Sequence, residues 1–135
     1  MKRKFLVLIC LLFAVLGCEK NKVDTKTVPG LWTGTASSTT ESPKPYSWSV
    51  KTDGTMTWEG NWVGTTYQFG TGTWVLSGNT LTCNLITIYG YSGTVGTTQI
   101  FTAQFDPING TLSSGTWRNT NINNATGTFQ LTKIQ

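Results

Sequence analysis

The chain of 135 residues contains no histidine. Histidine is the usual general base, the usual partner of a nucleophilic serine and the commonest metal ligand, so its absence argues against most familiar hydrolases. No closely spaced cysteine pair and no dense carboxylate loop is present to hold a metal instead. We therefore expect neither a metal site nor a cofactor.

Acidic residues are also scarce, which limits acid and base catalysis. Asp53 and Asp106 are followed by glycine and proline, as is typical of turns. Glu59 alternates with threonines and is predicted to face solvent. A glycosidase-like pairing of Glu59 with Asp106 across about 5 to 10 Å is the alternative. The turn sequences favour the simpler interpretation, a protein that is not an enzyme.

A surplus of positive charge is absent from the main part of the chain. The formal net charge of +4 comes from ten basic and six acidic residues, but residues 28–135 hold four of each sign and are neutral. Lys2, Arg3 and Lys4 supply three of the positive charges at the start. Nucleic-acid binding, which needs a basic surface, is therefore not expected.

Long hydrophobic runs are missing except for Phe5 to Leu16, which follows the three basic residues. Twelve apolar residues are too few for a membrane span, which needs about 20, and the charged start followed by an apolar run is typical of a signal peptide. The run closes with Val15-Leu16-Gly17-Cys18. This ending resembles the lipobox of bacterial lipoproteins.

That resemblance implies that residues 1–17 are removed and that Cys18 carries the acyl chains, such as palmitate, that anchor the protein to membrane lipid. Glu19 follows the cysteine, and the same resemblance then points to the outer membrane of the cell envelope, on its periplasmic or surface face. Residues 18–27 are polar and charged and are predicted to be a flexible tether. With Cys10 and Cys18 so assigned, Cys83 has no disulfide partner, and its spacing from two leucines predicts a small buried side chain.

The remaining residues, 28–135, lack helical periodicity, and apolar side chains recur at every second position. Threonine and glycine dominate, and turn residues separate the alternating runs. We expect a single antiparallel up-and-down β-barrel of about eight strands, because closure removes exposed sheet edges. The expected strands are residues 30–38, 46–52, 55–59, 66–76, 80–88, 97–105, 111–118 and 127–134.

The sequence also predicts one turn and one bulge in these strands. Asp53-Gly54 predicts a type I′ turn, in which both residues have positive φ. Within residues 66–76, Tyr67 and Phe69 have one parity whereas Trp74 and Leu76 have the other. A bulge near Gly70 to Gly72 is predicted to bring both sets inside.

The first expected strand opens with Gly30-Leu31-Trp32-Thr33-Gly34-Thr35, and the last contains Gly127-Thr128-Phe129-Gln130-Leu131. These segments resemble the Gly-x-Trp opening and the final strand of lipocalin-like and avidin-like barrels, in which the tryptophan plugs one end. The whole domain is similar to small lipocalin-like lipoproteins of Bacteroidota-type bacteria. The resemblance assigns Gly30 and Trp32 a structural role. The biotin-binding residues of avidin find no match.

Six tryptophans allow two interpretations, a packed interior or a ligand-binding mouth. In the second, Trp48, Trp58 and Trp117 line an apolar cup to which Ser49, Thr57, Asn61 or Tyr67 add hydrogen bonds. Trp62 is predicted to contact something outside. We expect a barrel that binds a small apolar or amphipathic ligand. The alternative is a module that binds an envelope protein or inhibits a protease.

Overall fold

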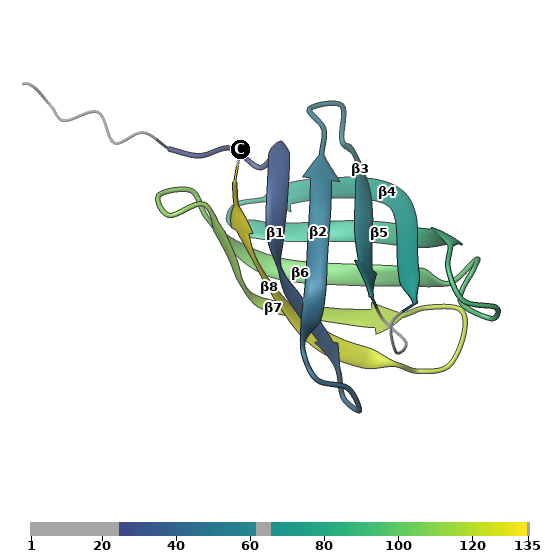
Figure 1. Cartoon of the computed structure of the whole chain (residues 1–135). Helices are drawn as coiled ribbons and strands as arrows, with labels where there is room; N and C mark the ends of the chain where they lie inside the picture. The colour runs from purple at the N-terminus through teal and green to yellow at the C-terminus, as the bar shows by residue number, and fades with distance from the viewer. Residues whose placement is uncertain (1–24, 62–65, 135) are drawn as a thin grey trace, which may run out of the picture.

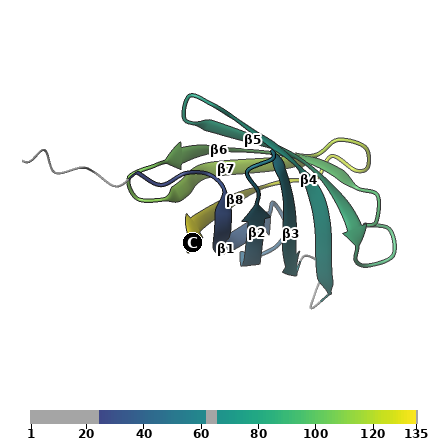
Figure 2. The same ribbon diagram turned by 90° about the horizontal axis from the view of Figure 1, so that it is seen from above.

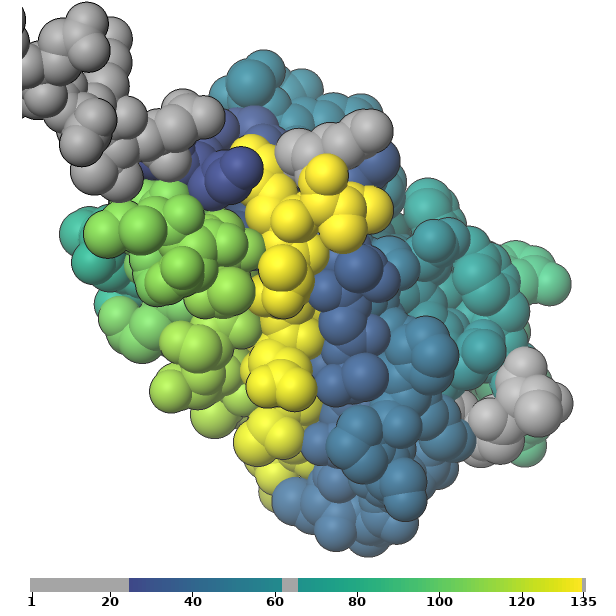
Figure 3. Space-filling model, turned by 60° about the vertical axis from the view of Figure 1, so that its left-hand side comes forward, coloured from purple at the N-terminus to yellow at the C-terminus, as the bar shows by residue number. Residues whose placement is uncertain are grey.

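The computed structural model describes residues 25–61 and 66–134. Each strand pairs antiparallel with the next, and the last pairs with the first, so the sheet is a closed barrel. Figure 3 shows β8 as a yellow stripe between the green β7 and the purple β1. The predicted all-β, eight-stranded, up-and-down barrel is confirmed. The strands are β1 (Gly30–Ser38), β2 (Lys44–Val50), β3 (Thr55–Asn61), β4 (Tyr67–Ser77), β5 (Thr80–Tyr89), β6 (Thr98–Asp106), β7 (Thr111–Asn119) and β8 (Thr126–Lys133).

The described part of the chain is entirely strands, turns and loops, and it has no helix long and apolar enough to cross a membrane. The predicted signal peptide, Cys18 and Trp62 lie outside the described residues. From the segment predicted to be a tether, the backbone N–H of Lys26 donates to the carbonyl oxygen of Pro107 at 2.7 Å. The last residues of that segment therefore contact the barrel.

The strands form two layers that cross steeply, with β1, β2 and β3 in front of β5, β6 and β7 in Figure 1 and opposite them in Figure 2. β4 bends from one layer to the other. Gly70 and Gly72 lie within this strand, and glycine permits such bends because it has no side chain to crowd the neighbouring strands. A Cβ atom at Gly70 would overlap the ring of Trp58, so the glycine also makes room for an aromatic side chain.

The predicted change of parity in β4 is wrong. Gln68 and Gly70 face the interior along with Trp74, whereas Tyr67 and Phe69 face outward. An irregularity does lie between Phe69 and Gly70, but the extra residue belongs to β5, because Phe69 pairs with Tyr89 and Gly70 with Thr87. The bulge turns Tyr89 outward, where its ring centroid lies 6.4 Å from that of Tyr67.

The turn at Asp53-Gly54 also differs from the prediction. Gly54 has a φ of 84°, but Asp53 is not among the described residues with positive φ. The N–H of Gly54 donates to the carbonyl oxygen of Lys51, and the Asp53 carboxylate accepts hydrogen bonds from the N–H and hydroxyl of Thr55. These bonds fix a longer turn in which a single glycine takes the left-handed conformation.

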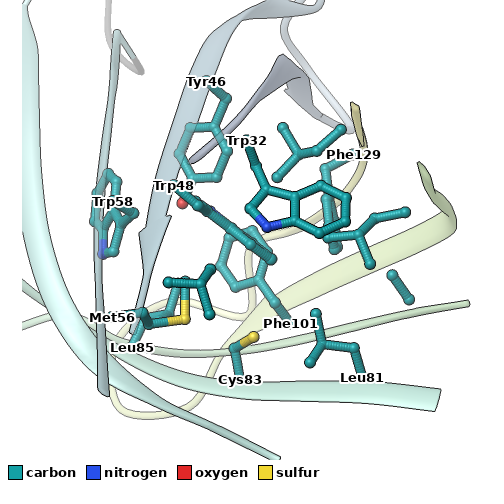
Figure 4. Close-up of a cluster of buried hydrophobic side chains, with 14 of the residues drawn as sticks. Trp32, Tyr46, Trp48, Met56, Trp58, Leu81, Cys83, Leu85, Phe101 and Phe129 are labelled. Carbon is teal, nitrogen blue, oxygen red and sulfur yellow. The ribbon is translucent and has the colours of Figure 1, made fainter. Parts of the chain in front are cut away.

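Aromatic rings fill most of the barrel interior (Figure 4). Tyr46 stacks on Phe101 with centroids 5.8 Å apart, and Trp48 lies edge-on to the same ring. Cys83 is buried among them, and burial raises the pKa of its thiol to about 12, so it is a packing residue as predicted. The core therefore supplies the hydrophobic free energy that closes the barrel.

One end of the barrel is sealed by Trp32. Its side chain is buried against Phe105, and its indole N–H donates to the carbonyl oxygen of Val28 at 2.8 Å. Gly30, two residues earlier, has a φ of 140°, which suits glycine. Gly30 and Trp32 therefore lie at the end of the barrel where β1 begins. We refer to this as the closed end.

Candidate functional site: the mouth of the barrel

The opposite end of the barrel, which we call the mouth, is covered by the links between β1 and β2, β5 and β6, and β7 and β8. A cavity of about 170 Å³ lies beneath these links. Its walls combine the ends of strands with loop residues. The lining residues are Ser38, Glu41, Gln68, Thr87, Gly93, Thr94, Thr97, Gln99, Trp117, Asn119, Ile122, Asn123 and Ala125.

Three polar side chains of the cavity are buried without a complete set of hydrogen bonds. Gln68, Thr97 and Gln99 are only 3%, 4% and 7% exposed. The amide nitrogen of Gln68, the hydroxyl of Thr97 and the amide oxygen of Gln99 have no partner among the described residues. An unsatisfied buried polar atom costs about 1–3 kcal/mol, so three of them around one cavity lower the stability of the fold unless another molecule supplies the missing hydrogen bonds.

Other polar groups of the mouth hold each other in place. The amide nitrogen of Gln99 donates to Asn119 Oδ1 at 3.0 Å, and Asn119 Nδ2 donates to Asn123 Oδ1 at 2.6 Å. Asn123 has a φ of 23°, a conformation that asparagine tolerates better than most residues. The nitrogen of Gln99 is thus engaged by Asn119, whereas its amide oxygen is buried without a partner.

The link between β5 and β6 is fastened in the same way. Thr87 and the residues around Thr97 exchange two backbone hydrogen bonds, from Thr87 N–H to Thr97 O and from Gly96 N–H to Thr87 O. Asn121, from the link between β7 and β8, bonds to Thr98 N–H and to Gly96 O. The two links are thus tied together, and the cavity has a preformed shape.

An apolar side completes the cavity. Trp117 is buried, stacks on Phe101 with centroids 6.0 Å apart and donates its indole N–H to the carbonyl oxygen of Ser37 at 2.9 Å. Ile122 and Ala125 lie beside it in the lining. The cavity is therefore amphipathic, with hydroxyl and amide groups from β4, β5, β6 and β7 and apolar groups from β7 and the last link.

Charge is nearly absent from the mouth. Among the described residues that line the cavity, Glu41 is the only ionisable one, and its Oε2 lies 2.9 Å from Lys44 Nζ in an ion pair. Asp53 and Asp106 lie in turns at the closed end, where hydrogen bonds from Thr55 and Asn109 lower the pKa values of their carboxyl groups. The described residues include no cluster of three potential metal ligands.

The residues predicted to bind a ligand are dispersed. Trp48 and Trp58 are packed in the core, and of the predicted residues that the structure describes only Trp117 lines the cavity. Tyr67 lies on the outer face and donates its hydroxyl to Glu59 Oε2 at 2.6 Å, a bond that raises the pKa of the tyrosine. Ser49 and Thr57 alternate with the buried Trp48 and Trp58, and all four residues line a hollow on the outside of the barrel that Trp117 does not reach.

The polar residues of the mouth were not predicted from the sequence, although their positions along the strands indicate that they face inward. Thr97 and Gln99 continue the parity of Phe101, and Thr87 continues that of Cys83 and Leu85. Polar residues at inward positions mark the places where a strand leaves the packed core. These positions gather at one end because neighbouring antiparallel strands bring the end of one beside the start of the next.

A second hollow lies on the outside of the barrel, across β1, β2 and β3, with a volume of about 350 Å³. Small side chains such as Ser47 and Ser49 contribute to it, along with Leu31, Phe69 and Ile134. Leu31 and Ile134 are 40% and 60% exposed. This outer groove is larger than the cavity of the mouth, and the indole nitrogens of Trp48 and Trp58 in its lining are also buried without a hydrogen-bond partner.

Comparison with known proteins gives no match: no family model, no curated protein and no solved structure matches the chain.

Proposed function

We propose that this protein is a non-catalytic, lipocalin-like binding barrel that takes a small amphipathic ligand into its mouth. The observation that carries the proposal is the set of buried, unpaired atoms of Gln68, Thr97 and Gln99 around one preformed cavity. A ligand that supplies hydrogen bonds to these atoms removes the free energy that their burial costs. The packed aromatic core supports a site at the mouth rather than one deep in the barrel.

The size of the cavity limits the ligand. Ligand sites for drug-sized molecules usually measure about 300–1,000 Å³. At about 170 Å³ the mouth holds only part of such a molecule, with the remainder outside. Haem, sterols and whole fatty acids do not fit inside. The expectation of a small apolar or amphipathic ligand is thereby narrowed to a small amphipathic group.

Binding is tested by titrating the purified protein with a panel of small amphipathic compounds while recording tryptophan emission and the midpoint of thermal unfolding. A ligand at 100 times its Kd stabilises the native state by about 2.7 kcal/mol and raises the midpoint by several degrees. Trp117 reports occupancy because it lines the cavity.

Two variants locate the response. In Ala125→Phe an added phenyl group occupies the cavity, and binding is expected to disappear. Thr126→Phe adds the same group at the next residue, which is exposed on β8, and is expected to bind as the wild type does. Equal binding by both variants would place the ligand elsewhere and refute the proposal.

We also propose that the protein is tethered to the outer membrane through acyl chains on Cys18. The support is the lipobox-like sequence at residues 15–18 and the polar segment that follows it. Cys18→Ser is expected to prevent acylation and to leave the protein out of the detergent-soluble membrane fraction, whereas Cys10→Ser changes nothing. Mass spectrometry of the N-terminus checks both, and an unmodified Cys18 in the wild type would contradict the anchor.

The second candidate function is a module that binds another envelope protein through the outer groove. The exposed Leu31 and Ile134 favour it, since exposed apolar side chains around a groove suit a protein partner. Ser49→Arg fills this groove without touching the mouth. Loss of the cellular function in Ser49→Arg, with no effect of Ala125→Phe, would favour the partner over the ligand.

A further inference from the structure

We propose that the group recognised by the mouth is a neutral sugar ring, either a free monosaccharide or the end of a longer glycan. This inference rests on the proposed ligand-binding function and specifies its substrate class. It follows from three properties of the cavity, namely its hydrogen-bonding groups, its lack of net charge and its size.

The hydrogen-bonding groups require donors and acceptors on the same ligand. Gln68 Nε2 donates only, Gln99 Oε1 accepts only, and the Thr97 hydroxyl does either. A hydroxyl group on the ligand satisfies each of them, because it is both a donor and an acceptor. A ring with several hydroxyls around its edge therefore matches residues from β4 and β6 at once.

The apolar side of the cavity fits the face of such a ring. A pyranose presents C–H groups on its faces and hydroxyls at its edge, and Trp117 offers an aromatic surface beside Ala125 and Ile122. Amide side chains on one side and a tryptophan on the other thus match the two kinds of surface on a sugar. A wholly apolar group would leave the amides and the threonine unpaired, which opposes its binding.

Charge excludes the close relatives of a neutral sugar. The carboxylate of Glu41 is neutralised by Lys44, and no other ionisable side chain among the described residues lines the cavity. A carboxylate or ammonium group on the ligand loses water here without gaining a counter-ion, which is costly. A fatty acid, a nucleotide or a uronic acid is therefore disfavoured.

The volume sets how much of the ligand enters. About 170 Å³ corresponds to the space of roughly five or six water molecules at about 30 Å³ each, which is of the order of one ring. Because the cavity has room for about one ring, a glycan bound by its terminal ring continues outward from the mouth. Free sugar and chain end use the same groups of the cavity.

The experiment compares neutral sugars with charged sugars of the same ring size. The purified protein is titrated with glucose, galactose and N-acetylglucosamine, and with glucuronate and glucosamine as charged counterparts, by saturation-transfer NMR and tryptophan emission. We expect at least one neutral sugar to bind with a Kd of roughly millimolar order, as is usual for so small a ligand. We expect the charged counterparts to bind at least about tenfold more weakly.

Variants assign the binding to the named atoms. Thr97→Val keeps the shape but removes the hydroxyl, and Gln99→Leu removes the amide; each is expected to weaken sugar binding about tenfold. Thr73→Val makes the same change as Thr97→Val at an exposed position on β4 and is expected to have no effect. Oligosaccharides that bind more tightly than their terminal monosaccharide identify a glycan end, and equal affinities identify a free sugar.

Failure of the sugar inference is distinct from failure of the proposed function. If an uncharged alkyl alcohol binds and Ala125→Phe abolishes its binding, while no neutral sugar binds, the sugar inference is overturned and the binding barrel stands. If a sugar binds equally to the wild type and to Ala125→Phe, the ligand lies outside the mouth and both proposals are overturned.

Discussion

The closed end and the mouth of this barrel are built on the same strands but satisfy their polar groups differently. At the closed end the buried indole N–H of Trp32 has a partner in the carbonyl oxygen of Val28. At the mouth, Gln68, Thr97 and Gln99 are almost as deeply buried and yet retain atoms without a partner. Side chains are therefore buried at both ends, but these polar atoms of the mouth lack the kind of hydrogen-bond partner that Trp32 has at the closed end. The mouth is suited to contacts with a further molecule.

The largest effect is expected from breaking the closed end. Trp32→Ala removes a fully buried indole and its hydrogen bond, and we expect a loss of about 3–5 kcal/mol in the free energy of unfolding. Ile122→Ala, at the rim of the mouth, is expected to stay within about 0.5 kcal/mol of the wild type. Urea denaturation of both variants measures the difference. Similar losses at the two ends would contradict the contrast.

A smaller effect of opposite sign is expected at the mouth. Thr97→Val replaces a buried, unpaired hydroxyl by a methyl group of similar size, so we expect the free energy of unfolding to rise by about 1 kcal/mol. Thr73→Val on the outer face is the matched control, with a change near zero. Thermal unfolding monitored by circular dichroism checks this. A destabilised Thr97→Val would show that the hydroxyl is needed for the fold itself.

The smallest effect is expected when the pH is lowered, and it concerns the turns at the closed end. Hydrogen bonds from Asn109 and Ile108 lower the pKa of Asp106, so this carboxylate stabilises the folded state above its unfolded pKa, and the contribution is lost as the pH falls through the folded pKa. Asp53 acts in the same sense in its own turn through Thr55. Near and below pH 4 we expect faster hydrogen exchange in these turns than in the mouth.

The control for this prediction is Asp106→Asn, which removes the titrating group at one turn. In that variant the acid dependence of exchange around residues 106–110 is expected to flatten, while the turn at Asp53 keeps its dependence. An unchanged profile would mean that the carboxylate of Asp106 contributes nothing to the pH dependence of that turn.

Alternation of side chains predicted all eight strands, because a period of two and a run of turn residues are local properties of the chain. The parity of β4 was not predictable in this way, because Tyr67 and Phe69 are as apolar as core residues, yet they continue the outward parity of Thr73 in a strand without an extra residue. The predicted type I′ turn failed for a related reason, since the same Asp-Gly pair also ends a longer turn that closes on Lys51.

The candidate site was predicted only in part. The three tryptophans expected around one cup are separated, because Trp117 lines the cavity of the mouth whereas Trp48 and Trp58 are packed inside the barrel beside the outer groove. Nothing in the sequence next to Gln68 or Gln99 indicates a binding role, because an inward glutamine suggests a site only when neighbouring strands place other polar residues beside it. Which residues are neighbours depends on the register of the sheet, and the register cannot be read from the sequence of a single strand.

The contact of Lys133 with the start of the barrel has a consequence for orientation. Its Nζ donates to the carbonyl oxygens of Thr27 and Pro29, both at 2.6 Å, and thereby fixes the path by which the chain reaches β1. This path meets the barrel at the closed end, beside the C-terminal end of β8 (Figure 1). A surface that holds the protein by its N-terminal segment would therefore face the closed end of the barrel. The mouth would then point away from that surface, toward the surrounding medium.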